Sequence, residues 1–279
     1  HIIILYMKFI VAGCARNCEK YIKSVFKNIK KICNIIDVRQ IIVAYDESND
    51  KTLLEIIKQK KCIDVDIKIL INKDLLTPYR TQNICNARNK LLEEINAYQP
   101  SIDKFIMMDF DDVCSKPINI DVLKEGLMLN KDCVTFNNKN YYDFWALSID
   151  GYQFSAWHFN EPNRYLKLLR LYLLKKMSET KNNFVECDSA FNGLGIYKLK
   201  SFKNCKYQSL MDYDYYCKDK INYITSTFDM KVLKDIKPYD CEHRIFHLMA
   251  KKLNKAQIII YKKNLFPEYV GFHTDFIYM

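Results

Sequence analysis

Short apolar runs alternate with amphipathic stretches through the first 115 residues of the chain. Strand patterns occupy residues 8–12, 40–45, 65–71 and 104–108, and helical patterns occupy residues 18–32, 51–60 and 81–96. A strand, a helix and a further strand in succession are typical of βαβ units, whose strands lie parallel in one sheet. The first half of the chain therefore predicts a mostly parallel sheet flanked by helices.

The second half has a different pattern. Aromatic side chains crowd residues 141–172, which include both tryptophans, Trp145 and Trp157. Residues 191–197 predict a tight turn into a short strand, residues 239–253 a helix, and residues 257–261 a last strand before a tail. Only six prolines and six glycines occur in 279 residues, so no flexible linker divides the chain and we expect one domain.

Composition narrows the class of protein. A hydrophobic content of 49% is enough for a full core, and the net charge of +10 comes from scattered lysines. Scattered charge favours small anionic ligands over nucleic acid, whose binding proteins gather basic residues in patches. The eleven cysteines form no C-x-x-C pair, which predicts free thiols in a reducing, cytoplasmic compartment. Lys8 and Arg170 interrupt the longest apolar runs, so no membrane span is expected.

The strongest candidate for chemistry follows the apolar run at residues 104–108. Asp109 and Asp111 are two residues apart, so on an extended strand both carboxylates face one side and can share a hard cation. Asp112 offers a third oxygen. Carboxylates this close repel one another and are costly to desolvate unless a cation compensates them. The motif therefore predicts a divalent metal or phosphate chemistry.

Two further polar segments follow predicted strands, which is where open α/β sheets bind ligands. Gly13 permits a close approach and Arg16 could meet a phosphate, although a solvated turn is the alternative for this segment. In the loop after the second strand, we expect Asp46 to contact a ligand and Asp50 to cap the next helix.

Two arginines lie on or near the helix that precedes the acidic strand. Arg80 and Arg88 are two helical turns apart and could share a face. Either side chain could bind a diphosphate or brace the carboxylates, and a surface salt bridge is the alternative for both.

The order of these motifs resembles glycosyltransferases of the GT-A fold. The shared motifs are Ala15-Arg16-Asn17, Asp46-x-Ser48-x-Asp50, Ala87-Arg88-Asn89 and the D-x-D of Asp109 and Asp111. Residues 188–197 are similar to the acceptor-side glycine loop of that fold. Cys241-Glu242-His243 is similar to the Glu-His helix start of fungal capsule-type mannosyltransferases and their viral or bacterial relatives. The resemblance covers most of residues 7–275.

The resemblance implies an α/β, Rossmann-like GT-A fold with a mixed, mostly parallel sheet flanked by helices. It implies a single catalytic domain over residues 1–279, with a nucleotide-sugar-binding half at 7–115 and an acceptor-binding half at 116–279. The implied activity is metal-dependent transfer of a sugar from a UDP- or GDP-linked donor to a glycan or other hydroxyl acceptor. The implied cofactor is Mn²⁺ or Mg²⁺.

The resemblance also implies roles for individual residues. Glu242 would be the catalytic carboxylate, acting as general base. The metal ligands would be Asp109, Asp111, Asp112, His243 and His273; the donor would contact Ala12, Arg16, Asp46, Arg80, Arg88, Asp109 and Phe110; the acceptor would contact Trp145, Asp188 and Gly193. His247 lies one helical turn from His243 and competes for the metal role, and an ordinary helix surface is the alternative for both. For Trp145 the alternative is packing in the core.

Other functions fit parts of the pattern. Residues 109–113 match the D-x-D-x-[TV] motif of haloacid-dehalogenase-type phosphatases, in which Asp109 would be phosphorylated. Those enzymes usually carry the motif on the first strand with a second acidic cluster downstream, whereas here it follows three strands and no G-D-x-x-x-D occurs. A nucleotidyltransferase would need a glycine-rich phosphate loop, which is missing near the first strand. A non-catalytic nucleotide- or glycan-binding module stays open, and turnover would distinguish it from an enzyme.

Overall fold

The computed structural model describes residues 7–73, 76–230 and 239–270. Its strands are β1 Lys8–Ala15, β2 Asp37–Tyr45, β3 Ile67–Ile71, β4 Lys104–Met108, β5 Cys133–Asn137, β6 Phe184–Cys187, β7 Leu194–Lys198 and β8 Ile258–Asn264. Its α-helices are α2 Glu19–Cys33, α3 Thr52–Gln59, α4 Arg80–Ala97, α5 Asp112–Ser115, α6 Ile120–Met128, α7 Pro162–Glu179, α8 Lys218–Thr227 and α9 Glu242–Asn254. Short 3₁₀ helices are η1 Ala156–His158, η2 Leu199–Phe202 and η3 Tyr213–Tyr215. Each strand and helix predicted above is present, with ends that differ by up to three residues.

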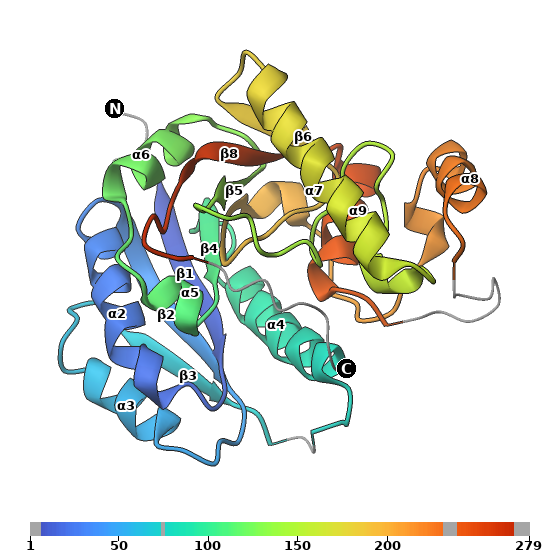
Figure 1. The fold of residues 1–279 in the computed structure, drawn as a ribbon. Helices are drawn as coiled ribbons and strands as arrows, with labels where there is room; N and C mark the ends of the chain where they lie inside the picture. Colours follow the sequence, from blue (N-terminus) through green and yellow to red (C-terminus); the bar gives the residue numbers. More distant parts are fainter. Residues whose placement is uncertain (1–6, 74–75, 231–238, 271–279) are drawn as a thin grey trace.

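Among the described residues the strands form one eight-stranded sheet in the order β3-β2-β1-β4-β7-β5-β8-β6 (Figure 1). Strands β3, β2, β1 and β4 are parallel to one another, and β5 is parallel to β8. Strand β7 is antiparallel to both β4 and β5, and β6 is antiparallel to β8. The predicted fold class, a mixed and mostly parallel sheet flanked by helices, is confirmed.

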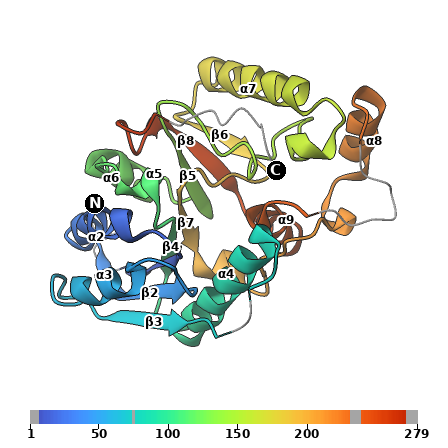
Figure 2. The ribbon, with the colours of Figure 1, turned by 60° about the horizontal axis from the view of Figure 1, so that its bottom comes forward.

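The sheet separates two apolar cores, because successive side chains on a strand point to opposite faces. On β1, Phe9 and Val11 pack in the core under α2, α3 and α6, whereas Ile10 and Ala12 pack in the core under α4, α7 and α9. Figure 1 shows α2 and α3 on one face of the sheet with α4 on the other, and Figure 2 shows α4 beside α9. This arrangement brings the start of α9 to the same face as α4.

The aromatic segment supplies much of the second core. Phe159 stacks on Tyr165 with ring centroids 4.2 Å apart, and both rings contact Phe228. Trp145 and Trp157 are half-buried and meet edge to face, with centroids 4.8 Å apart. Core packing therefore accounts for much of the aromatic content of this segment, and the acceptor contact of the half-buried Trp145 stays a prediction.

Two predictions from composition can be compared with the fold. All eleven cysteines lie in the described ranges and are free thiols there. Across those ranges, the helices are too short or too polar to cross a bilayer.

Candidate active site

The end of β4 places the acidic motif next to the glycine turn before β7. The backbone N–H of Asp109 donates to the carbonyl of Gly193 over 2.9 Å, and Gly193 has a φ of +95° that favours glycine. The side chains of Asp109 and Phe110 then point to opposite sides. Phe110 is buried against Phe26, and a Cβ on Gly13 would lie 2.4 Å from the Phe110 ring. Gly13 therefore permits the approach of Phe110, and the expectation that Phe110 contacts a donor is wrong for its side chain, which packs in the core.

Asp109 faces the other side, where it meets a buried arginine. Arg88 Nη2 donates to Asp109 Oδ1 over 2.8 Å, and Arg88 Nη1 donates to Glu242 Oε1 over 2.6 Å. The guanidinium also lies over the ring of Phe191, with its central carbon 4.8 Å from the ring centroid. Arg88 and Glu242 are each 5% exposed, so the surface salt bridge offered as the alternative for Arg88 is wrong. One guanidinium thus joins α4, the end of β4 and the start of α9.

Negative charge exceeds positive charge at this tip. Burial, followed by the nearby Asp111, raises the pKa of Asp109 well above its ordinary value even though Arg88 opposes the shift. Burial, followed by Asp112, raises the pKa of Asp111 to about 6. Burial alone would lower the pKa of Arg88, but Glu242 and Asp109 outweigh it and raise that pKa. The charge on the two aspartates is therefore only partly compensated by the protein.

The donor set at the tip fits a cation that binds jointly with a phosphate. Within the described ranges, no three His, Cys, Asp or Glu side chains are grouped to hold a metal. Mg²⁺, however, is commonly bound by one or two carboxylates, with water and substrate phosphate completing its shell. Asp109 is 24% exposed at its side chain, and Asp111 uses one oxygen to accept from the N–H of Val113 over 3.3 Å. Their charge, which Arg88 and Arg80 compensate only in part, suits such a cation. The side chain of Asp112, the first residue of α5, stays a predicted third ligand.

The histidines of α9 are both buried, so the helix-surface alternative is wrong. His247 is fully occupied: its Nδ1 hydrogen-bonds Ser189 Oγ at 2.9 Å and its Nε2 hydrogen-bonds Tyr197 OH at 3.1 Å. His243 is 1% exposed and stacks on Phe191, with neither ring nitrogen hydrogen-bonded. Burial, followed by the charge of Arg88, lowers the pKa of His243 well below its ordinary value. A sealed ring next to a guanidinium is a poor place for a second cation, which argues against His243 as a metal ligand.

The remaining metal candidate cannot be compared with the fold, because His273 lies outside the described residues.

On the donor side, the loops after β1 and β2 lie together. Asp46 is 7% exposed and accepts from Asn72 Nδ2 over 2.9 Å, while the exposed Arg16 donates through Nε to the carbonyl of Glu47. Ala12 is fully buried within the sheet between β2 and β4, so the expected donor contact is wrong for its side chain, and a contact at its backbone stays a prediction. Strand β1 runs on to Ala15, three residues past the predicted end, which explains the burial of this segment.

The predictions for Asp50 and for Arg80 can also be compared with the structure. Asp50 accepts from the N–H of Thr52 and from the N–H of Glu19, each over 3.0 Å, so it satisfies the first N–H of α3, as predicted, and of α2 as well, although Lys51 and Cys18 hold the N-cap positions. Arg80 is exposed at the start of α4 and lies close enough to Asp111 to lower that residue's pKa against the effects of burial and Asp112. Arg80 and Arg88 therefore lie in different environments, one exposed and one buried.

Two of the acceptor-side candidates, Asp188 and Gly193, lie in different parts of the structure. Asp188 pairs with Lys251 and, over 3.1 Å, with Lys220, and it lines a small cavity of about 200 Å³ with these lysines. Lys251 is nine residues beyond Glu242 on α9, which corresponds to about 13 Å along the helix. The structure therefore places Gly193 at the acidic tip and Asp188 at a distance from the start of α9.

Sequence reasoning missed Asp143, which belongs to the same charged region. Its two oxygens accept from the N–H groups of Ala146, over 3.1 Å, and Asn192, over 3.3 Å. Burial raises its pKa, and it acts in turn to raise the pKa of Asp109. A carboxylate inside the aromatic run 141–145 was the signal, because burying such a charge without a functional or structural reason is costly.

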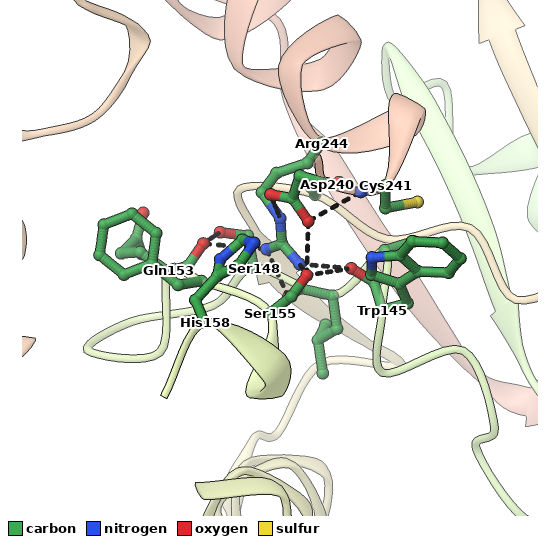
Figure 3. A network of polar contacts seen from close by, with 12 residues as sticks. Trp145, Ser148, Gln153, Ser155, His158, Asp240, Cys241 and Arg244 are labelled. Carbon is green, nitrogen blue, oxygen red and sulfur yellow. Dashed lines mark hydrogen bonds and ion pairs between the residues drawn. The ribbon is translucent and has the colours of Figure 1, made fainter. Parts of the chain in front are cut away.

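A second network fixes the start of α9 (Figure 3). Arg244 is fully buried and forms an ion pair with Asp240, whose Oδ2 lies 2.8 Å from Arg244 Nε. The same guanidinium donates to the carbonyls of Trp145, Leu147 (2.8 Å) and Gln153 (2.9 Å), and to Ser155 Oγ over 2.9 Å. The loop 145–155 is thereby tied to the helix end that carries Glu242.

No protein-family model and no curated protein matches this chain. Among solved structures, the crystal structure of S. aureus TarS 1–349 is 14% identical with a TM-score of 0.46 and covers 92% of this chain and 59% of its own. The same protein in complex with UDP-GlcNAc is 15% identical with a TM-score of 0.45, covering 98% of this chain and 62% of its own. M. tuberculosis glucosyl-3-phosphoglycerate synthase is 14% identical with a TM-score of 0.41, covering 70% and 58%. This chain thus spans about three fifths of these neighbours, and similarity this remote transfers no function to it.

Proposed function

We propose that this protein is a metal-dependent glycosyltransferase of the GT-A type. It moves a sugar from a nucleotide-sugar donor, UDP- or GDP-linked, to a glycan or other hydroxyl acceptor. Residues 7–115 form the donor half of one catalytic domain, and residues 116–279 form the acceptor half.

The observation that carries the proposal is the buried bridge from Asp109 through Arg88 to Glu242. It lies at the carboxyl end of β4 next to β1, in the edge of the sheet where open α/β folds bind ligands. A carboxylate suited to a cation and a carboxylate suited to proton transfer are therefore held in one unit. The excess negative charge around Asp109 and Asp111 supports cation binding at that edge.

In this proposal, different residues hold the cation, neutralise the leaving group and position the carboxylates. Asp109 and Asp111 would hold the cation and thereby orient the donor diphosphate, while the exposed Arg80 adds positive charge near the leaving group. A bound divalent cation would stabilise the negative charge that develops on the departing diphosphate. Arg88 holds Asp109 and Glu242 in register, so that donor and acceptor meet with a fixed geometry.

Proton removal from the acceptor hydroxyl falls to Glu242 in this proposal. Arg88 binds its Oε1, and Oε2 accepts only a weak hydrogen bond from the Cys241 thiol over 3.9 Å, so Oε2 is the oxygen that would accept the proton. Asp143 is the second carboxylate in reach of this region, since its charge affects Asp109 and it is itself affected by Glu242. The variants Glu242→Gln and Asp143→Asn distinguish the two, because only the base variant loses turnover while keeping donor affinity.

The test is a panel of UDP- and GDP-sugars incubated with the purified protein, with Mn²⁺ or with EDTA. We expect one donor to be hydrolysed slowly, or transferred to an added acceptor, only when the metal is present, and to raise the melting temperature. Simple phosphate esters serve as the opposing substrate. Hydrolysis of these esters, with a phosphoaspartate at Asp109 trapped by beryllium fluoride, would contradict the proposal and support a phosphatase.

A further inference from the structure

A cavity of about 550 Å³ lies at the other end of β4 from the acidic motif. Its lining comes from the segment before β1, the turn before β4 with the first residue of β4, the turn between α6 and β5, and the end of β7 with η2 and the residue after it. The lining residues are Met7, Gln99, Pro100, Ile102, Asp103, Lys104, Asn130, Lys198, Leu199, Lys200 and Lys203. The volume is in the range of small-molecule sites. Four of these side chains are lysines and one is an aspartate, so the lining carries an excess of positive charge.

Lys104, at the start of β4, lies in this lining without a counter-ion. It is 4% exposed, and across residues 7–73, 76–230 and 239–270 its ammonium forms no hydrogen bond or ion pair. Directly opposite it in the antiparallel pairing of β4 with β7 stands Lys198. Burial, followed by the charge of Lys198, lowers the pKa of Lys104, and the charge of Asp103 opposes the shift without reversing it. Like charges placed directly across two strands destabilise a sheet. The ion pair of Lys198 with Asp132 relieves part of this repulsion, and an anion between the two lysines would relieve more of it.

The nearby carboxylates are already occupied. Asp103 accepts through Oδ2 from the backbone N–H of Lys8 over 2.8 Å, which fixes it at the start of β1. Asp132 lies 3.3 Å from Lys198 Nζ but also accepts from Ser201 Oγ and from the N–H of Gln257. Neither carboxylate is paired with Lys104, so the cavity keeps a donor that no described side chain satisfies.

We propose that this cavity binds a small molecule that carries a phosphate group. The phosphate would lie between Lys104 and Lys198, where each ammonium can donate to it. The exposed Lys200 and Lys203 at the rim add attraction for a multiply charged anion. The volume exceeds that of a phosphate alone, and Met7, Pro100, Ile102 and Leu199 offer apolar contacts for an organic body. The site is separate from the acidic tip and does not rest on the proposed glycosyl transfer.

The test measures the melting temperature of the full chain against inorganic phosphate, in EDTA and at constant ionic strength. EDTA removes divalent cations, so that the acidic tip does not contribute. We expect phosphate to raise the melting temperature of the wild type by a few degrees, because a ligand that binds only the folded state stabilises it. In Lys104→Met the apparent affinity falls at least about tenfold, since a charge-assisted hydrogen bond is lost. Lys198→Met shows a smaller loss, because Lys198 has other partners.

Two controls complete the design. Lys124→Met changes an exposed lysine of α6 that pairs with Asp121 over 3.5 Å, and it should keep the full response to phosphate. Lys104→Arg keeps a buried cation and should keep most of the response, even if Lys104→Met folds poorly. No response in the wild type, or an equal response in Lys104→Met and wild type, would overturn the proposal. Lys104-dependent sedimentation with vesicles of phosphatidylglycerol, without a response to soluble phosphate, would overturn the small-molecule assignment in favour of a lipid headgroup.

Discussion

Two buried arginines, Arg88 on α4 and Arg244 on α9, have opposite environments. Arg244 meets one carboxylate, Asp240, and spends its other donors on three backbone carbonyls and the hydroxyl of Ser155. Arg88 meets two carboxylates, Glu242 and Asp109, and makes no hydrogen bond to a backbone carbonyl in the described ranges. Both guanidiniums are at most 5% exposed, so burial does not distinguish them.

The difference lies in the kind of partner. Backbone carbonyls cannot move without moving the chain, so Arg244, whose two Nη atoms bind three carbonyls and a hydroxyl, fixes a loop to a helix (Figure 3). Carboxylates can change partners, because a cation or a proton can replace the guanidinium. Arg88 therefore lies in a network that can respond to a ligand, and Arg244 in one that supports it.

The comparison predicts its largest effect for Arg244→Met. The substitution leaves Asp240 buried without its cation, so we expect the free energy of unfolding to fall by about 3–5 kcal/mol. Urea denaturation followed by circular dichroism measures the loss. The control is Arg164→Met, which removes a surface pair with Glu161 and should change stability by less than about 0.5 kcal/mol. A loss below about 1 kcal/mol for Arg244→Met would contradict its structural role.

The next effect concerns catalysis at the network of Arg88, Asp109 and Glu242. Glu242→Gln keeps an oxygen for Arg88 but removes the basic carboxylate, so turnover should fall about a hundredfold or more. Donor affinity, measured by calorimetry, should change little because the aspartates are intact. Equal losses of turnover and affinity would assign Glu242 to binding in place of proton transfer.

Arg88→Met should cost less stability than Arg244→Met, about 2 kcal/mol, because the part-exposed Asp109 can take up a proton or a cation. Mn²⁺ should recover part of this loss by replacing the missing charge. Denaturation with and without Mn²⁺ gives the recovery, with the wild type as reference. If Mn²⁺ stabilises the variant no more than the wild type, a cation does not replace Arg88, and the claim that its network responds to a ligand is contradicted.

The effect that is smallest per step is the dependence of stability on pH, counted for one pH unit. Burial lowers the pKa of His247 from 6.5 to about 3, so between these values the unfolded chain binds a proton that the folded chain excludes. Stability should therefore fall as the pH falls through this window, by about 1.4 kcal/mol per pH unit for this group. The lowered pKa values of His158 and His243 act in the same direction. In His247→Gln the slope should decrease by about one proton, and an unchanged slope would show that His247 titrates normally.

The sequence predicted the strands and helices that surround the site better than the contacts within the site. Apolar runs located β4 and the acidic tip correctly, and the order of strands and helices predicted the parallel half of the sheet. Arg88 was a candidate, but its partners lie 21 and 154 residues away, and no local pattern encodes such a pairing. The burial of Ala12 follows from its place between β2 and β4, and that of Phe110 from its packing against Phe26 and Gly13, and these contacts depend on the folded sheet. The pairing of Lys104 with Lys198 likewise depends on the register between β4 and β7.

Calorimetry of UDP and of GDP binding, each titrated with and without Mn²⁺, tests the central claim most directly. We expect one nucleotide to bind the wild type only when Mn²⁺ is present, and Asp109→Ala and Asp111→Ala to lose that binding while they stay folded. Asp121→Ala, an exposed aspartate on α6, should bind as the wild type does. Binding that is equal with and without Mn²⁺, or unchanged in both aspartate variants, would contradict a cation site at the end of β4.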